Sequence, residues 1–169
     1  MWIKYDPHRI KNIFVKKIIF FLLLYCNFAH SLEIKCSFEE VYTSGQTQNG
    51  ILFFKDKKMR YQYFDEKLYT IIFKNNNFYL IHNFNTKIVE KINKNIEVIQ
   101  SIKEIILDYP AINNIYEKDK MKIRIEKSKQ NFLKRIGVSS EKINLSINIY
   151  DCNFGEINDK YFNHFNFLK

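Results

Sequence analysis

Beyond residue 31, apolar and polar residues alternate in short runs that polar turns separate. A period of two is typical of β-strands that bury one face. The clearest case is 143–150, where every odd position is aliphatic and the even positions are mostly polar. The pattern predicts strands at 32–42, 51–55, 59–63, 68–73, 78–82, 86–92, 120–126, 132–138 and 143–150.

One segment has a different period. Isoleucines recur every three or four residues in 96–106, which predicts a helix over 96–108 that ends before Pro110. The chain closes with an aromatic segment, 161–167. The strands follow one another through short turns at 43–50, 56–58, 75–77 and 83–85, without the crossovers that parallel strands need. We therefore expect a mainly β fold with one or two helices, in which a curved antiparallel sheet forms an incomplete β-barrel covered by a helix.

The N-terminal segment has another character. Basic residues precede the apolar run 18–28, and Ala29 and Ser31 are small residues at the −3 and −1 positions of a cut after Ser31. This arrangement is typical of a secretory signal peptide. The run is short for a bilayer span, which takes about 20 residues, although an uncleaved anchor is the alternative. We predict a signal peptide at 1–31 and one β domain at 32–169.

Export changes the interpretation of the cysteines. Lipidation at Cys26 is a weaker alternative, because the bulky Tyr25 precedes it where a lipoprotein cleavage site needs a small residue. Cleavage would leave Cys36 and Cys152, which lie 116 positions apart. Two cysteines in an oxidising compartment permit one disulfide, worth roughly 4–5 kcal/mol in the chain-entropy model. Two free thiols packed as small apolar side chains are the alternative.

Charge argues against a nucleic-acid partner. The net charge of +9 falls to +5 without residues 1–31, which carry a net +4. The remaining basic residues are spread along the chain and often adjoin acids, whereas nucleic-acid binding needs a concentrated basic surface.

Catalytic motifs are also missing from the sequence. His82 and His164 lie far from any cysteine or carboxylate pair at metal-ligand spacing, and the chain has no nucleophile elbow and no phosphate-binding glycine loop. Glu39 and Glu40 are adjacent, so in a strand they would point to opposite faces and could not act as a pair. We predict no enzyme, no metal site and no cofactor; a small exported enzyme without a recognisable motif is the remaining alternative.

The segment from Gln46 to Ile92 resembles the LolA family, the periplasmic carriers of outer-membrane lipoproteins. The shared features are a Gln-rich turn ending in Gly, an apolar strand, a basic turn with an Arg-aromatic strand, an apolar strand and an aromatic strand. They correspond here to 46–50, 51–55, 57–63, 68–72 and 77–81. The predicted helix and the turn at 157–162 also match the family. Two features differ: no amphipathic helix precedes the first strand, and Asp56-Lys57 replaces the family's Arg-Pro pair.

The resemblance implies a LolA/LolB-like fold and a monomer in the periplasm of a Gram-negative bacterium. It further implies that the protein takes acyl chains of lipoproteins, or a similar lipid, from an inner-membrane donor complex. The protein would shield them in an apolar concave cavity and deliver them to an outer-membrane acceptor. An exported β adaptor or sensor domain that binds a protein partner without lipid is the alternative.

The residues predicted to line that cavity occupy the more apolar face of each strand and of the helix, and any β domain would need the same residues for its core. Arg60 is a cation on an otherwise apolar strand, so it could hydrogen-bond a lid carbonyl or an acyl ester, or lie on a solvated outer face. The predicted acyl-binding residues are Phe53, Met59, Arg60, Tyr61, Tyr63, Ile71, Phe73, Phe78, Leu80, Ile99, Ile102 and Ile106.

Overall fold

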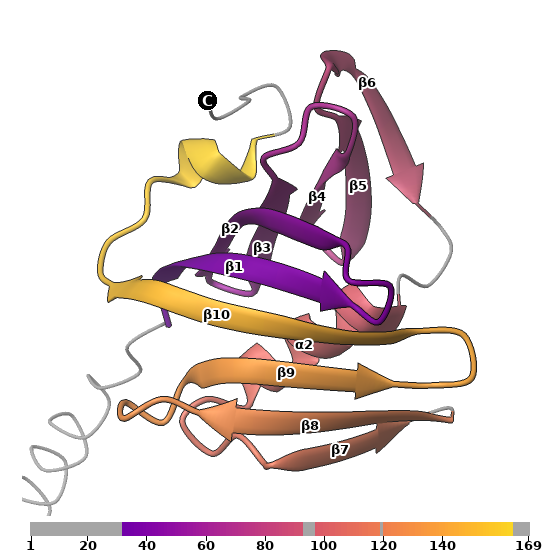
Figure 1. The fold of residues 1–169 in the computed structure, drawn as a ribbon. Helices are drawn as coiled ribbons and strands as arrows, with labels where there is room; N and C mark the ends of the chain where they lie inside the picture. Colours follow the sequence, from indigo (N-terminus) through magenta and orange to yellow (C-terminus); the bar gives the residue numbers. More distant parts are fainter. Residues whose placement is uncertain (1–31, 93–96, 119, 164–169) are drawn as a thin grey trace, which may run out of the picture. The chain divides into compact units, whose positions relative to one another are not determined.

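The computed structural model describes residues 32–92, 97–118 and 120–163, and the predicted signal peptide at 1–31 lies outside them. Within these residues the chain forms ten strands, one α-helix and a short 3-10 helix (Figure 1). The strands are β1 (Ile34–Tyr42), β2 (Thr47–Lys55), β3 (Lys58–Tyr63), β4 (Tyr69–Lys74), β5 (Asn77–His82), β6 (Asn85–Ile92), β7 (Ile115–Lys118), β8 (Met121–Lys127), β9 (Leu133–Ser139) and β10 (Asn144–Phe154). The helices are α2 (Glu97–Leu107) and η1 (Asp159–Phe162).

All ten strands belong to one antiparallel sheet in the order β6-β5-β4-β3-β2-β1-β10-β9-β8-β7. One half of the sheet is a meander of β1 to β6, and the other half is a meander of β7 to β10. The last strand, β10, pairs with β1 and so joins the two halves (Figure 1). The edge strands β6 and β7 do not pair with each other in the part of the chain that the structure describes. The sheet is therefore curved and unclosed, which confirms the predicted mainly β, incomplete-barrel fold with a helix.

One face of the sheet, the inner face, packs against α2. Alternation places Ile34, Cys36 and Phe38 of β1 on this face, where they join Leu52 and Phe54 of β2 in the main core. The helix contributes a stripe of buried isoleucines at the spacing that puts residues on one side of a helix: Ile99, Ile102, Ile105 and Ile106. No helix among residues 32–92, 97–118 and 120–163 is both long and apolar enough to cross a membrane.

The opposite face, the outer face, carries a second and smaller apolar cluster under the segment that contains η1. Phe53 of β2 packs there with Ile157 and Phe162, and its ring stacks on Tyr161 with the centroids 4.7 Å apart. Polar contacts hold the same segment to the sheet: Lys55 Nζ donates to the carbonyl oxygen of Ile157 at 2.7 Å. The chain after β10 thus crosses the outer face of β2 and β3.

Three features of the sheet differ from the sequence prediction by more than two residues. Thr47–Gly50 belongs to β2, although its polar residues predict a turn. The pattern misses this end of the strand because it is largely exposed and buries only Gly50. Strand β7 was not predicted, since it is a short edge strand without a buried residue and so has no apolar alternation. Strand β10 continues to Phe154 past a residue with positive φ, Asp151. Of the aromatic segment 161–167, residues 164–167 lie outside the described part.

Gly50 has only a hydrogen atom as its side chain, and this leaves room for an aromatic stack. Phe38 lies opposite Gly50 in the β1–β2 pair, and its ring stacks on Tyr61 with the centroids 4.0 Å apart. A Cβ atom at Gly50 would overlap both the Phe38 ring and the backbone carbonyl oxygen of Gln62. We therefore expect Gly50→Ala to lower the free energy of unfolding by about 1–3 kcal/mol, the usual cost of overpacking.

Urea unfolding monitored by circular dichroism measures this effect. Gly155→Ala is the matched control, because a Cβ atom at Gly155 meets nothing within 4 Å and its stability should be close to that of the wild type. Equal stability of the two variants would contradict the packing argument.

Candidate functional site

Strand register brings most of the predicted lining residues together on the inner face. Met59 of β3 pairs with Phe73 of β4, which pairs with Phe78 of β5, so the three form one row across the sheet. The neighbouring row runs through Tyr61, Ile71 and Leu80 in the same way. The predicted residues found on the inner face, or on the side of α2 that packs on it, are Met59, Tyr61, Tyr63, Ile71, Phe73, Phe78, Leu80, Ile99, Ile102 and Ile106.

Phe53 lies elsewhere. It pairs with Arg60 across β2 and β3, and both side chains are on the outer face. The prediction that Phe53 lies on the same face as Met59 is therefore wrong. Arg60 lies on the side of β3 opposite Met59, as alternation along the strand requires. Residues 51–54 are all apolar, so their pattern does not determine which side of the strand faces α2.

The Arg60 guanidinium is buried, with 0% of the residue exposed. Its Nε donates to Gln62 Oε1 at 2.9 Å and its Nη1 donates to the carbonyl oxygen of Tyr161 at 3.0 Å. Its Nη2 has no hydrogen-bond partner among the described residues, and burial lowers the pKa of the guanidinium to about 10. Arg60 therefore fastens the segment around η1 to the outer face; it is neither solvated nor directed toward α2.

Side chains of the protein fill most of the space between α2 and the sheet. Met59, Tyr61, Ile102 and Ile106 are almost fully buried there. A cavity of about 380 Å³ remains beside the first turn of α2, which we term the α2 cavity. Its lining residues are Glu40, Tyr42, Tyr63, Ile71, Glu97, Val98, Ile99, Ile143 and Leu145. Three of them, Tyr63, Ile71 and Ile99, are among the residues predicted to bind acyl chains.

Glu40 is the buried carboxylate of this cavity, and only 2% of the residue is exposed. Three tyrosyl hydroxyls donate to its carboxylate. Tyr61 donates to Oε1 at 2.7 Å, Tyr42 donates to Oε2 at 2.6 Å, and Tyr63 lies 3.0 and 3.1 Å from the two oxygens. The tyrosines are positioned by the packing of their own rings: those of Tyr61 and Tyr63 meet edge to face, with the centroids 5.5 Å apart.

The electrostatics of this group keep the tyrosines protonated. Burial raises the pKa of Tyr61 and of Tyr63 well above the ordinary value, and the negative charge of Glu40 raises both further. The pKa of Tyr42 is also raised, first by burial and then by its hydrogen bond to Glu40. The three hydroxyls are therefore stable donors to a buried carboxylate.

Sequence reasoning considered Glu40 only as one of two adjacent acids and missed this arrangement. A signal was present, because Ile34, Cys36 and Phe38 alternate inward along β1 and the next inward position is Glu40. An acid at an inward position of an apolar strand predicts a buried carboxylate that needs hydrogen-bond donors.

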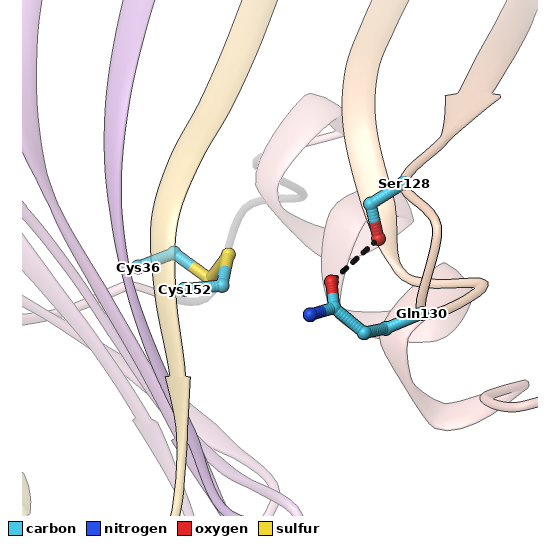
Figure 2. The surroundings of a disulfide bond; sticks show 4 residues. All are labelled: Cys36, Ser128, Gln130 and Cys152. Atoms are coloured by element: carbon cyan, nitrogen blue, oxygen red, sulfur yellow. Dashed lines mark hydrogen bonds between the residues drawn. A yellow bond between two sulfur atoms is a disulfide. The ribbon is translucent and has the colours of Figure 1, made fainter.

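Cys36 and Cys152 are joined by a disulfide, with the sulfur atoms 2.07 Å apart (Figure 2). The bond connects β1 to β10 where their register shifts by one residue, between Lys35 and Ser37. Figure 2 shows the disulfide facing the loop in which Ser128 Oγ lies 3.4 Å from Gln130 Oε1. The disulfide therefore fastens β1 to its neighbour β10, the pair through which the two meanders of the sheet are joined.

Metal-ligating residues do not gather in the described part of the chain: no group of three or more His, Cys, Asp or Glu side chains there could hold an ion. The aliphatic side chains of the α2 cavity and its hydrogen-bonded carboxylate suit binding of a small ligand. Comparison with known proteins adds no assignment, since no protein-family model matches the chain and no curated protein matches it.

Proposed function

We propose that this protein is a carrier, not an enzyme, and that it binds acyl chains of lipoproteins or a similar lipid between α2 and the inner face. In this proposal it works as a monomer in the periplasm, between an inner-membrane donor complex and an outer-membrane acceptor, as its resemblance to the LolA family implies. The single observation that supports it best is the α2 cavity, which lies between the helix and an apolar curved sheet.

The way α2 is attached supports displacement by a ligand. The helix packs on the sheet through isoleucine side chains, and no hydrogen bond joins its backbone to a strand among the residues described. Its polar links are Lys103, whose Nζ lies 4.2 Å from the ring centroid of Phe73, and Glu104, whose carboxylate lies 3.2 Å from Lys118 Nζ. Because packing of this kind is not directional, an acyl chain can replace the helix side chains on the sheet.

Energetics favour such an exchange. Each methylene that leaves water contributes about 0.8 kcal/mol, so a long acyl chain offsets the loss of several isoleucine contacts. The α2 cavity, at about 380 Å³, lies within the range of about 300–1,000 Å³ typical of small-molecule sites. We expect the chain to enter there first and to extend along the inner face as α2 moves.

Native mass spectrometry of the protein purified from cells that express the full chain tests the proposal. We expect a co-purifying acylated molecule, or capture of one after challenge with lipid. A ligand-free mass after that challenge would overturn the carrier function.

A pair of tryptophan variants locates the site. Val98→Trp places an indole where Val98 lines the α2 cavity. We expect at least about a tenfold loss of affinity for a fluorescent fatty acyl probe. Exclusion of only two methylenes of the probe from the cavity would already cause about a tenfold loss. Leu107→Trp is the matched control on the same helix, because Leu107 is 44% exposed and does not line the cavity. Equal affinities of the two variants would remove the α2 cavity from the binding site.

One observation favours the adaptor alternative. Most of the inner face is filled by the protein's own side chains, as in a domain that needs no ligand. Exposed aromatic residues of the domain, among them Phe64, Tyr69 and Phe84, would then be available to a protein partner. The ligand-free mass described above is the outcome that this alternative predicts.

A further inference from the structure

Two acidic residues line the α2 cavity. Among the described residues, Glu40 and Glu97 both line it, whereas no lysine, arginine or histidine does. The rest of the lining is tyrosine and aliphatic side chains. A ligand that matches this lining has an apolar body and one positive group.

The Glu40 carboxylate has room for one more donor. An ionised carboxylate offers about four acceptor positions, and Tyr42, Tyr61 and Tyr63 have one hydroxyl hydrogen each to give. The bonds of Tyr42 and Tyr61 are the short ones, whereas Tyr63 divides its contact between the two oxygens. One acceptor position therefore remains for an N–H group that enters the cavity.

Glu40 also has no counter-charge among the residues that the structure describes. None of the ion pairs formed by residues 32–92, 97–118 and 120–163 includes it, although it is nine-tenths buried. A buried charge that has only neutral donors keeps part of its desolvation cost, and a cation beside it removes that cost. Tyr42 and Tyr63 line the same space, and an aromatic ring attracts a cation that lies over its face.

We propose that the α2 cavity selects an amphiphile with an ammonium group next to its apolar chain, and that Glu40 binds the ammonium. This inference rests on the proposed carrier function, because the apolar chain is the part that a carrier shields. It also predicts discrimination: a fatty carboxylate would bring a third negative charge to Glu40 and Glu97 and is disfavoured, so free fatty acids are not the preferred ligands.

Three probes of equal chain length test the inference on the full-chain protein, below their micelle concentrations: dodecylamine, dodecanol and dodecanoate. At pH 7 dodecylamine is cationic, as alkylamines lose their proton near pH 10. We expect dodecylamine to bind at least about tenfold more tightly than dodecanol, in line with a charged hydrogen bond, and dodecanoate to bind most weakly.

Variants then identify the group responsible. Glu40→Gln keeps the shape of the side chain and should remove the preference for dodecylamine while dodecanol binding changes less than about twofold. Glu39→Gln, the neighbour on the other side of β1, is the matched control and should keep the preference. If Glu40→Gln does not fold, Glu97→Gln, on the cavity wall, should still reduce the preference.

The outcomes separate the two proposals. Equal binding of the three probes by the wild type, or an unchanged preference in a folded Glu40→Gln variant, would overturn the ammonium inference and leave the carrier function standing. Failure of every probe to bind would overturn the carrier function itself.

Discussion

Reduction of the disulfide between Cys36 and Cys152 should lower the free energy of unfolding by about 4–5 kcal/mol, a large part of the stability of a small domain. The bond closes a loop over a sequence separation of 116 residues, and the entropy that it removes from the unfolded chain grows with loop length. Its position adds to the effect, because β1 and β10 form the only pairing between the two halves of the described sheet.

Urea unfolding with and without reductant measures this loss, in a Cys26→Ser background so that no third thiol can exchange. The double variant Cys36→Ala with Cys152→Ala should unfold at the midpoint of the reduced protein and should not respond to reductant. A loss below about 1 kcal/mol would show that the loop contributes little entropy and that the pairing of β1 with β10 is held by its other contacts.

The sequence predicts the sheet well where a strand has one buried and one solvated face. The alternation in 143–150 gives β10, and the isoleucine period gives α2 to within one residue over the described part. Strand β7 has no such signal, because it is a four-residue edge strand whose residues are all at least partly exposed. Pairing between β1 and β10 is also invisible in the pattern, since the two strands lie at opposite ends of the domain in sequence.

The candidate site was harder to predict for a physical reason. An acyl site and a protein core use the same side chains, so apolar periodicity finds Tyr63, Ile71 and Ile99 without separating the cavity from the filled interior. Phe53 shows a second limit, because a strand that is apolar on both sides does not reveal which side meets α2. Glu40 shows the third: its partners come from β1 and β3, and only the register of the sheet brings the tyrosines of β3 to it.

The tyrosines around Glu40 should make the protein sensitive to alkali. An unfolded tyrosine ionises near about pH 10, whereas burial and the charge of Glu40 hold the pKa of Tyr61 and Tyr63 higher in the folded state. Above about pH 10 these tyrosines therefore bind fewer protons in the unfolded chain than in the folded protein, so their contribution to the free energy of unfolding decreases as the pH rises. The loss is at most about 1.4 kcal/mol per pH unit for each fully buried tyrosine.

Tyr61→Phe should separate this linkage from the loss of a hydrogen bond. At pH 8 the variant should be less stable than the wild type by about 1.5–3 kcal/mol, because a buried carboxylate loses one of its three donors. The stability of the variant should then fall less steeply than that of the wild type between pH 10 and about pH 12, because the variant lacks the raised pKa of Tyr61. Plots of the free energy of unfolding against pH should therefore converge for the two proteins. Tyr150→Phe is the control, because it removes the hydroxyl of an exposed tyrosine, and its stability should equal that of the wild type at every pH. The urea midpoint of each protein at each pH is the measurement. Parallel curves for Tyr61→Phe and the wild type would mean that the Tyr61 hydroxyl ionises as easily in the folded protein as in the unfolded chain, and the buried carboxylate with its tyrosines would then be open to water.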